Sequence, residues 1–252
     1  MAFMEIKLYS VTLGLATAVD VLLPERRQAR TPLKVLWLLH GFSGDHSVWC
    51  RQTGIERYVS GKDLCVIMPA VDRSFYADMA YGNNYYTYVS EELPQMMLNM
   101  LPISSKKEDN YIAGLSMGGY GTFKLALNQP ERFAAAASLS GSVDIQALFE
   151  NDSQLDDNII RQFDLIFGGQ DKFRYSMNDL RHMAELRKED TELPRLYMCC
   201  GKDDSLYEVN QRYLTHLEKL GIPVTYEEED GYGHVWEYWD KKIQRVLDWM
   251  GL

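Results

Sequence analysis

The stretch YIAGLSMGGYG, residues 111–121, places an apolar run directly before a serine that is surrounded by glycines. The run predicts a buried strand over 110–115, and a helical pattern follows the serine. Ser116 therefore lies at a sharp strand-to-helix turn, with Gly114 and Gly118 two positions away on either side. A G-x-S-x-G turn of this kind strains the serine backbone and exposes its hydroxyl, and larger flanking side chains would collide. The stretch predicts that Ser116 is a catalytic nucleophile.

A serine hydroxyl becomes a good nucleophile only when a base takes its proton, so the hypothesis requires a histidine. His234 lies in a glycine-flanked loop, GYGH, between the last predicted strand and the last predicted helix. A loop at that place can hold an imidazole over the carboxyl end of the sheet, and we predict that His234 is the base. Of the other histidines, His182 and His216 lie in helical patterns. His46 lies in a polar loop, and His40 lies at the end of a strand.

The base must be oriented by a third group, normally a carboxylate. The strand in LYMCCGKDDSLYE breaks at Gly201 and presents Asp203 and Asp204 at its carboxyl end. We predict Asp204, because the turn can aim it back toward the sheet, and Asp203 and Asp171 remain alternatives. The resulting chain order of serine, acid and histidine is that of the α/β-hydrolases.

An oxyanion hole requires preorganised N–H donors. The segment LLHGFSGDHSVW follows the first buried strand, and its Gly41 allows the backbone to turn so that the Phe42 N–H can face the serine. The second predicted donor is the N–H of Met117, the residue after the nucleophile.

Apolar runs alternate with helical patterns along the chain, which predicts an α/β fold with a mostly parallel, eight-stranded sheet flanked by helices on both faces. The first two strands are expected to form an antiparallel hairpin at one edge. We expect residues 1–252 to form a single α/β-hydrolase domain, with a polar cap or insertion around 143–192. The predicted strands are 3–12, 16–23, 33–39, 63–69, 110–115, 134–140, 195–200 and 222–229, and the predicted helices are 46–60, 88–101, 117–129, 176–190, 207–220 and 235–249.

Composition narrows the function classes. The chain has 252 residues, of which 46% are hydrophobic, and a formal net charge of -10, which argues against a nucleic-acid partner. No segment has the roughly 20 apolar residues that cross a bilayer, and the alternating N-terminus does not read as a signal peptide, so we expect no membrane partner and a cytoplasmic location. The four cysteines lack metal-ligand spacing, and no metal is expected.

Together these pieces resemble the esterase D family of α/β-hydrolases, most closely its bacterial tributyrin esterase (EstA-like) branch. The resemblance covers about residues 36 to 240 and implies hydrolysis of short-chain acyl esters, acetyl to butyryl, on tributyrin-type or acetylated-sugar substrates. It further implies an acyl-enzyme, no cofactor, an acid at Asp204 after C-G-x-x, and a base at the histidine of G-H-x-W, which is His234. The S-formylglutathione hydrolases, which are thioesterases, resemble the chain less around AYGNNYY.

Residues 75–88 carry six aromatic side chains and two asparagines, Asn83 and Asn84. They predict either an aromatic wall for the substrate or ordinary packing of a long loop. From these and neighbouring segments we expect Gly41, Trp49 and Tyr85 to contact substrate. The aromatic residues in question are Phe75, Tyr76, Tyr81, Tyr85, Tyr86 and Tyr88, and Trp236 and Trp239 are expected to serve mainly in core packing.

The sequence therefore predicts a serine carboxylesterase acting on a small-molecule ester. The alternatives are an S-formylglutathione hydrolase, an acyltransferase and, from another class, a non-catalytic interaction protein on the same fold. The sequence is compatible with a homo-oligomer.

Overall fold

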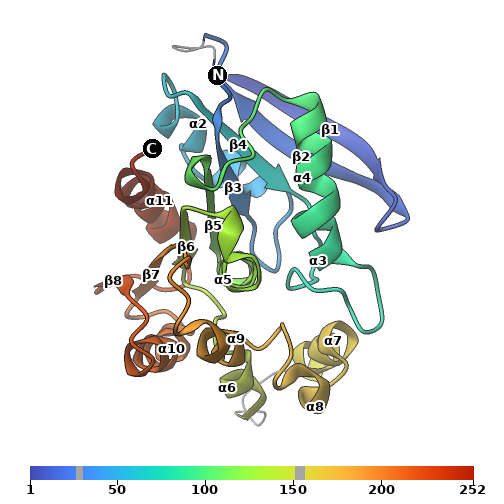
Figure 1. The fold of residues 1–252 in the computed structure, drawn as a ribbon. Coiled ribbons are helices and arrows are strands. Elements are labelled where there is room, and N and C mark those ends of the chain that lie inside the picture. Colours follow the sequence, from blue (N-terminus) through green and yellow to red (C-terminus); the bar gives the residue numbers. More distant parts are fainter. Residues whose placement is uncertain (27–30, 151–156) are drawn as a thin grey trace.

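The computed structural model of the protein describes residues 1–26, 31–150 and 157–252. One sheet runs through it with strand order β1-β2-β4-β3-β5-β6-β7-β8 (Figure 1). All eight predicted strands are confirmed, within a few residues at their ends. They are β1 (Ala2–Ser10), β2 (Leu15–Leu23), β3 (Lys34–Leu39), β4 (Leu64–Pro69), β5 (Asn110–Leu115), β6 (Ala135–Leu139), β7 (Arg195–Gly201) and β8 (Val224–Glu229).

The sheet is mixed but mostly parallel, as predicted. β1 pairs antiparallel with β2, and β2 pairs antiparallel with β4, whereas all later neighbours are parallel. The central strands β4 and β5 are buried at every residue, which explains their continuous apolar sequences. Since the parallel strands all point the same way, their carboxyl ends form a single edge, and the residues that follow them meet there.

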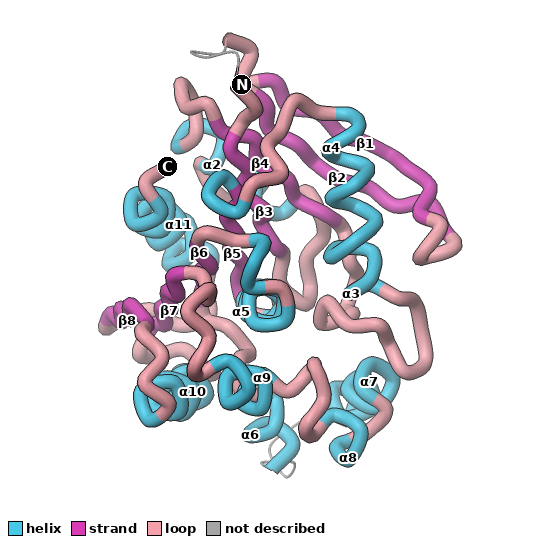
Figure 2. Tube along the Cα trace, in the orientation of Figure 1, coloured by secondary structure: helices cyan, strands magenta, loops and turns pink. Residues whose placement is uncertain are grey.

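Helices cover both faces of the sheet, and each face has its own core. On β3, Val35, Trp37 and Leu39 belong to one apolar cluster, whereas the alternate residues Leu36 and Leu38 belong to the other. The first cluster includes side chains of α4, α5 and α9, and the second includes side chains of α1, α2 and α11. Figure 2 shows α2 and α11 on one side of the central strands and α4 on the other. The helices are α1 (Val48–Gln52), α2 (Ile55–Tyr58), α3 (Tyr85–Thr87), α4 (Leu93–Met100), α5 (Met117–Asn128), α6 (Ile145–Glu150), α7 (Asp157–Phe167), α8 (Gln170–Phe173), α9 (Leu180–Arg187), α10 (Tyr207–Lys219) and α11 (Trp236–Met250).

Three predicted helices differ from the structure. The one expected over 88–101 begins with a π-helical turn, Tyr88–Glu92, before α4. The helix expected over 46–60 is split into α1 and α2, and the N–H of Gly54 between them donates to the Asp240 carboxylate instead of continuing a helix. The helix expected over 176–190 begins only at Leu180, because Asp179 caps it by accepting from the N–H groups of Arg181 and His182.

The expected insertion at 143–192 contains more helix than its polar sequence suggested. It holds α6, α7, α8 and α9, which gather at one end of the molecule, far from β1 (Figure 1). The polar run NDSQLDDN begins at residue 151, and most of it lies outside the described residues. Within the described part of the chain no helix is long and apolar enough to cross a membrane.

Helix α5 lies at the centre of the molecule and is buried almost along its whole length, including the charged residue Lys124. The Lys124 amine donates to the Asn178 side-chain oxygen and lies over the ring of Tyr86, 5.0 Å from its centroid. These partners are neutral, so they offset only part of the cost of burying an ammonium. Desolvation by burial therefore lowers the pKa of Lys124 to about 7.

We expect Lys124→Met to stabilise the protein most at low pH. Because its pKa is lowered in the folded protein, Lys124 is less protonated there than in the unfolded chain between about pH 7 and pH 10. The free energy of unfolding of the wild type should therefore rise with pH across that window, and the Met variant should lack this slope. Urea unfolding at pH 6 and pH 9 measures the difference, with the exposed Lys219→Met as control. Equal pH slopes for wild type and Lys124→Met would contradict the interpretation.

Candidate active site

The turn between β5 and α5 is a strained strand-to-helix junction. Ser116 has φ +54° and ψ −119°, a conformation that non-glycine residues rarely adopt. A Cβ on Gly114 would lie 2.4 Å from the Gly118 carbonyl oxygen, and one on Gly118 would lie 2.4 Å from the Leu39 oxygen. A backbone hydrogen bond holds the turn in this conformation, since the Ser116 N–H donates to the Leu139 oxygen at the end of β6, at 2.9 Å. Both glycines are thus required by close backbone approach, as the sequence predicted.

The structure brings Ser116, His234 and Asp204 together. Nε2 of His234 lies 3.0 Å from the Ser116 Oγ, and Nδ1 lies 2.9 Å and 3.0 Å from the two Asp204 carboxylate oxygens. Because a carboxylate only accepts, Nδ1 carries the proton and Nε2 is free to accept from the serine hydroxyl. The Asp204 side chain is fully buried, whereas His234 is 31% exposed. This is the geometry of a nucleophile, a base and a group that orients the base.

Backbone hydrogen bonds fix the acid loop to the base loop. The Asp203 N–H donates to the Tyr232 oxygen at 3.1 Å, two residues before His234. The Asp204 carboxylate also accepts from the N–H of Leu206 at 2.8 Å, which fixes its direction. The two alternatives for the acid lie elsewhere: Asp203 is exposed beside Asp204, and Asp171 is exposed on α8.

The remaining histidines have other partners. His46 lies 3.9 Å from Asp20, His182 packs edge-on against Tyr175, and His216 contacts the Arg181 oxygen. His40 is buried directly after β3. It lies close to the site, where its ring holds backbone groups in place.

His40 holds in place the Gly41–Phe42 peptide, whose N–H is one predicted oxyanion donor. Its Nδ1 lies 2.8 Å from the Gly41 oxygen, which also accepts from the Gly44 N–H at 3.0 Å. Its Nε2 accepts from the Val71 N–H at 3.1 Å. The Gly41 carbonyl and the Phe42 N–H are opposite ends of one trans peptide, so holding the carbonyl aims the N–H the other way.

This arrangement requires neutral His40 with its proton on Nδ1. Burial lowers the pKa of His40, because desolvation disfavours the imidazolium. The other predicted donor, the Met117 N–H, belongs to the first turn of α5, where N–H groups have no partner within the helix. The sequence places His40 only at a strand end, and the His40-Gly41 pair there is the available signal for this role.

Two further contacts that the sequence did not reveal support the triad. The Ser142 N–H donates to the Ser116 carbonyl at 3.2 Å, which ties the elbow to the loop after β6. The indole of Trp239 lies 4.7 Å from the His234 ring at 83° and donates to the Ser140 Oγ at 3.1 Å. The base is therefore packed on one side by a ring that is itself hydrogen-bonded in place.

Two cavities adjoin this site, and Phe42 borders both. One, of about 460 Å³, contains Ser116 and His234 and is walled by Leu115, Trp236 and Trp239. The other, of about 600 Å³, is largely apolar, and its lining residues are Phe42, Phe75, Ser142, Leu148, Ile159, Phe163, Ser205, Leu206, Glu208 and Val209.

Most of the aromatic segment at 75–88 packs into the core. Tyr81 is exposed, whereas the other five aromatic residues are buried, and among them Phe75 both lines the larger cavity and packs against Phe42. Of the three residues expected at the substrate, Gly41 lines the smaller cavity. Trp49 is buried with its indole N–H on the Leu39 oxygen, and the Tyr85 hydroxyl donates to Asp72. Contact of Trp49 and Tyr85 with substrate stays a prediction.

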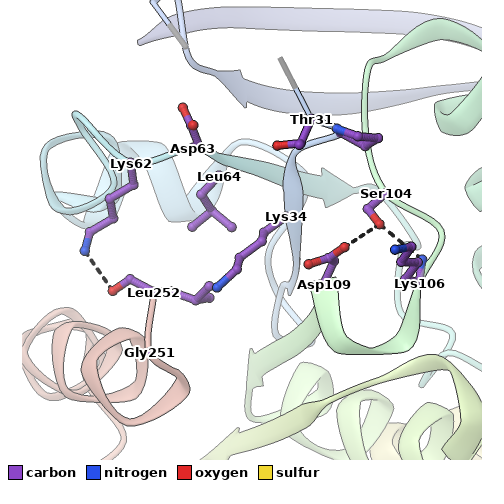
Figure 3. A pocket seen from close by; sticks show the side chains of 11 residues that line it. Thr31, Lys34, Lys62, Asp63, Leu64, Ser104, Lys106, Asp109, Gly251 and Leu252 are labelled. Atoms are coloured by element: carbon purple, nitrogen blue, oxygen red, sulfur yellow. Dashed lines mark hydrogen bonds between the residues drawn. The ribbon is translucent and has the colours of Figure 1, made fainter. Parts of the chain in front are cut away.

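A further cavity of about 520 Å³ lies at the opposite end of the sheet, where the parallel strands begin. Figure 3 shows its lining, with Lys34, Lys62 and Lys106 around it, Lys62 donating to the Leu252 oxygen and Asp109 accepting from Ser104. It holds none of the predicted site residues. In the described ranges, no group of three or more histidine, cysteine or acidic side chains is arranged to hold a metal ion.

Comparison with known proteins agrees with this geometry. The "Esterase" family model, described as "Putative esterase", matches residues 10–250. An acetyl esterase of Caldicellulosiruptor saccharolyticus is 30% identical over 99% of this chain and 98% of its own. Two Staphylococcus aureus structures, each 37% identical over 99% of this chain and 98% of theirs, are the fluorophosphonate-binding serine hydrolase FphF with bound substrate (TM-score 0.89) and the S-formylglutathione hydrolase FrmB (TM-score 0.86).

These matches span nearly the whole chain and confirm the resemblance to the esterase D group, whereas the narrower likeness to tributyrin esterases stays a prediction. The fold, the serine elbow and the family model lead to one assignment. The chain belongs to the esterase family of α/β-hydrolases, and it is a carboxylic ester hydrolase of the serine type.

Proposed function

We propose that the protein hydrolyses short-chain carboxylic esters through an acyl-enzyme formed on Ser116. The observation that carries the proposal is the continuous chain of contacts from the Ser116 hydroxyl through His234 to buried Asp204. His234 takes the hydroxyl proton as the serine attacks the ester carbonyl, and returns it to the departing alcohol. In the second half of the reaction, His234 takes a proton from a water molecule that attacks the acyl-enzyme. Asp204 stabilises the imidazolium in both halves.

The negative charge of the tetrahedral intermediate would be held by the N–H groups of Phe42 and Met117. The positioning of Gly41 by His40 and Gly44 supports this assignment, because it directs the Phe42 N–H before substrate arrives. Donors that are fixed in advance need no reorganisation when the charge develops, which is the source of their catalytic value. The chemistry requires no cofactor.

The two cavities support an ester as the substrate class. An ester bound with its carbonyl at Ser116 has an acyl part and an alcohol part, and the spaces on either side of Phe42 can receive one each. The short acyl preference draws on the acetyl esterase relative. Tributyrin-type glycerides and acetylated sugars fit this class, and the polar groups of Glu208 and Ser205 at the larger cavity can bind hydroxyls of the alcohol.

Thioester hydrolysis is the second candidate, and a specific finding favours it. The relative FrmB, at 37% identity, is an S-formylglutathione hydrolase, and the same triad would serve a thioester. The non-catalytic alternative is set aside, because an interaction protein would have no use for a buried acid and an oriented imidazole at a strained serine.

We expect Ser116→Ala to lose at least about 10⁴-fold in kcat on p-nitrophenyl acetate, because no other group can form the acyl-enzyme. The exposed Ser43→Ala, at the same cavity, is the matched control and should keep wild-type turnover. Equal melting temperatures would show that the fold is intact. Substantial hydrolysis by a folded Ser116→Ala would exclude the proposed nucleophile.

The adjacent aspartates provide a second matched pair. Asp204→Asn should lower kcat roughly 10⁴-fold, since an amide cannot stabilise the imidazolium and favours the wrong tautomer. Asp203→Asn should stay within about threefold of wild type, because that side chain is exposed and does not contact His234. The reverse pattern of losses would transfer the role to Asp203.

A substrate panel separates the two candidate functions. We expect kcat/KM to be highest for p-nitrophenyl acetate to butyrate and to fall at least about tenfold by the octanoate ester. S-Formylglutathione should be the poorer substrate, with Ser116→Ala as the blank for uncatalysed hydrolysis. A kcat/KM for the thioester above that for every oxyester would establish thioester hydrolysis instead.

A further inference from the structure

Strand β1 forms an open edge of the sheet. It stands at the end of the strand order, with β2 on its inner side, and it is nine residues long (Figure 1). Every second residue of an edge strand directs its N–H and C=O outward, so a long edge can pair with another chain unless something blocks it. The outer side of β1 therefore has the backbone groups to accept a further strand.

The side chains of β1 alternate between two faces. Met4, Ile6 and Leu8 are partly buried and pack against the core. The opposite face is exposed and unusually apolar at both ends: Phe3 is 52% and Tyr9 62% exposed. Between these aromatic residues lie Glu5 and Lys7, whose side chains pair with each other at 3.3 Å and are 47% and 78% exposed, so they can also reach charges on a second copy.

This pattern is self-complementary when β1 meets a second copy of itself antiparallel and centred on Ile6. Directly opposite residues share a face in such a pair. Glu5 then faces Lys7 of the other copy, Phe3 faces Tyr9, Met4 faces Leu8, and Ile6 faces Ile6, with each unlike pair occurring twice. Opposite charges, aromatic rings and aliphatic side chains are thus matched along the whole strand.

Neighbouring registers match the side chains of the two strands less well. A shift by one residue would place the apolar face of one copy beside the polar face of the other. Centring the pair on Glu5 would place Glu5 against Glu5, and centring it on Lys7 would place Lys7 against Lys7. The sequence of β1 therefore selects a single register.

We propose that two copies of this chain associate through antiparallel β1 strands centred on Ile6, which makes one continuous sheet across a two-fold axis. Such an interface is isologous, with the same patch contributed by both copies. The nucleophile follows β5 and the acid follows β7, several strands away from β1, so the dimer leaves both active sites open.

Charge exchange tests the proposal on the full-length protein. Sedimentation equilibrium should show a dimer for the wild type and at least a tenfold larger dissociation constant for Glu5→Lys and for Lys7→Glu, since each creates two like-charge pairs. The double variant E5K/K7E should return to within about threefold of wild type. Lys219→Glu, at an exposed position of α10, is the control for net charge, and unchanged esterase activity in every variant shows an intact fold.

A monomeric wild type would overturn the proposal, as would a dimer that neither single variant weakens or that the double variant does not restore. Amide hydrogen exchange of the wild type provides a test without substitutions. Amides in residues 3–9 should exchange more slowly at high than at low protein concentration, whereas those of β8, at the other edge, should not change. Concentration-independent exchange in β1 would equally refute the association.

Discussion

The rest of the site depends on the close approach of β3, β5 and α5 at the serine elbow. No side chain fits at Gly114 or Gly118, because each Cβ would enter the backbone of a neighbouring segment. This contact fixes the end of β3 against the start of α5, and the two predicted oxyanion donors come from these two segments. One steric constraint therefore sets the position of the proposed nucleophile and of the N–H groups proposed to stabilise the oxyanion.

Burial determines the protonation and the orientation of polar side chains around the serine elbow. His40 is neutral because it is buried, and only the neutral ring can both donate to Gly41 and accept from Val71. Asp204 is buried as well, but the imidazole and a backbone N–H satisfy its carboxylate. These two buried side chains thus have partners that determine their direction, which keeps them in a fixed arrangement without substrate.

The sequence predicted the eight strands and the mostly parallel sheet, because apolar runs mark the strands. Ser116 and His234 also had local signals, a glycine-bounded turn and a loop after a strand, whereas the acid stayed open among Asp204, Asp203 and Asp171. The sequence could not predict α7, which lies in a polar segment and packs through Phe163 and Phe167 with distant aromatic residues. Nor could it pair Trp239 with His234, although they are near in sequence, since that contact depends on how the loop after β8 enters α11. The packing of α7 joins segments remote in the chain, which only the fold brings together.

Residue 42 combines a predicted backbone role with a place in both cavities. The preceding peptide directs its N–H, and the residue lines the two cavities. An exchange of the ring for another side chain would reshape both compartments without moving the donor. A substitution at this position can therefore change which substrates fit while the backbone N–H stays in place. Selectivity can then change without a change in rate enhancement.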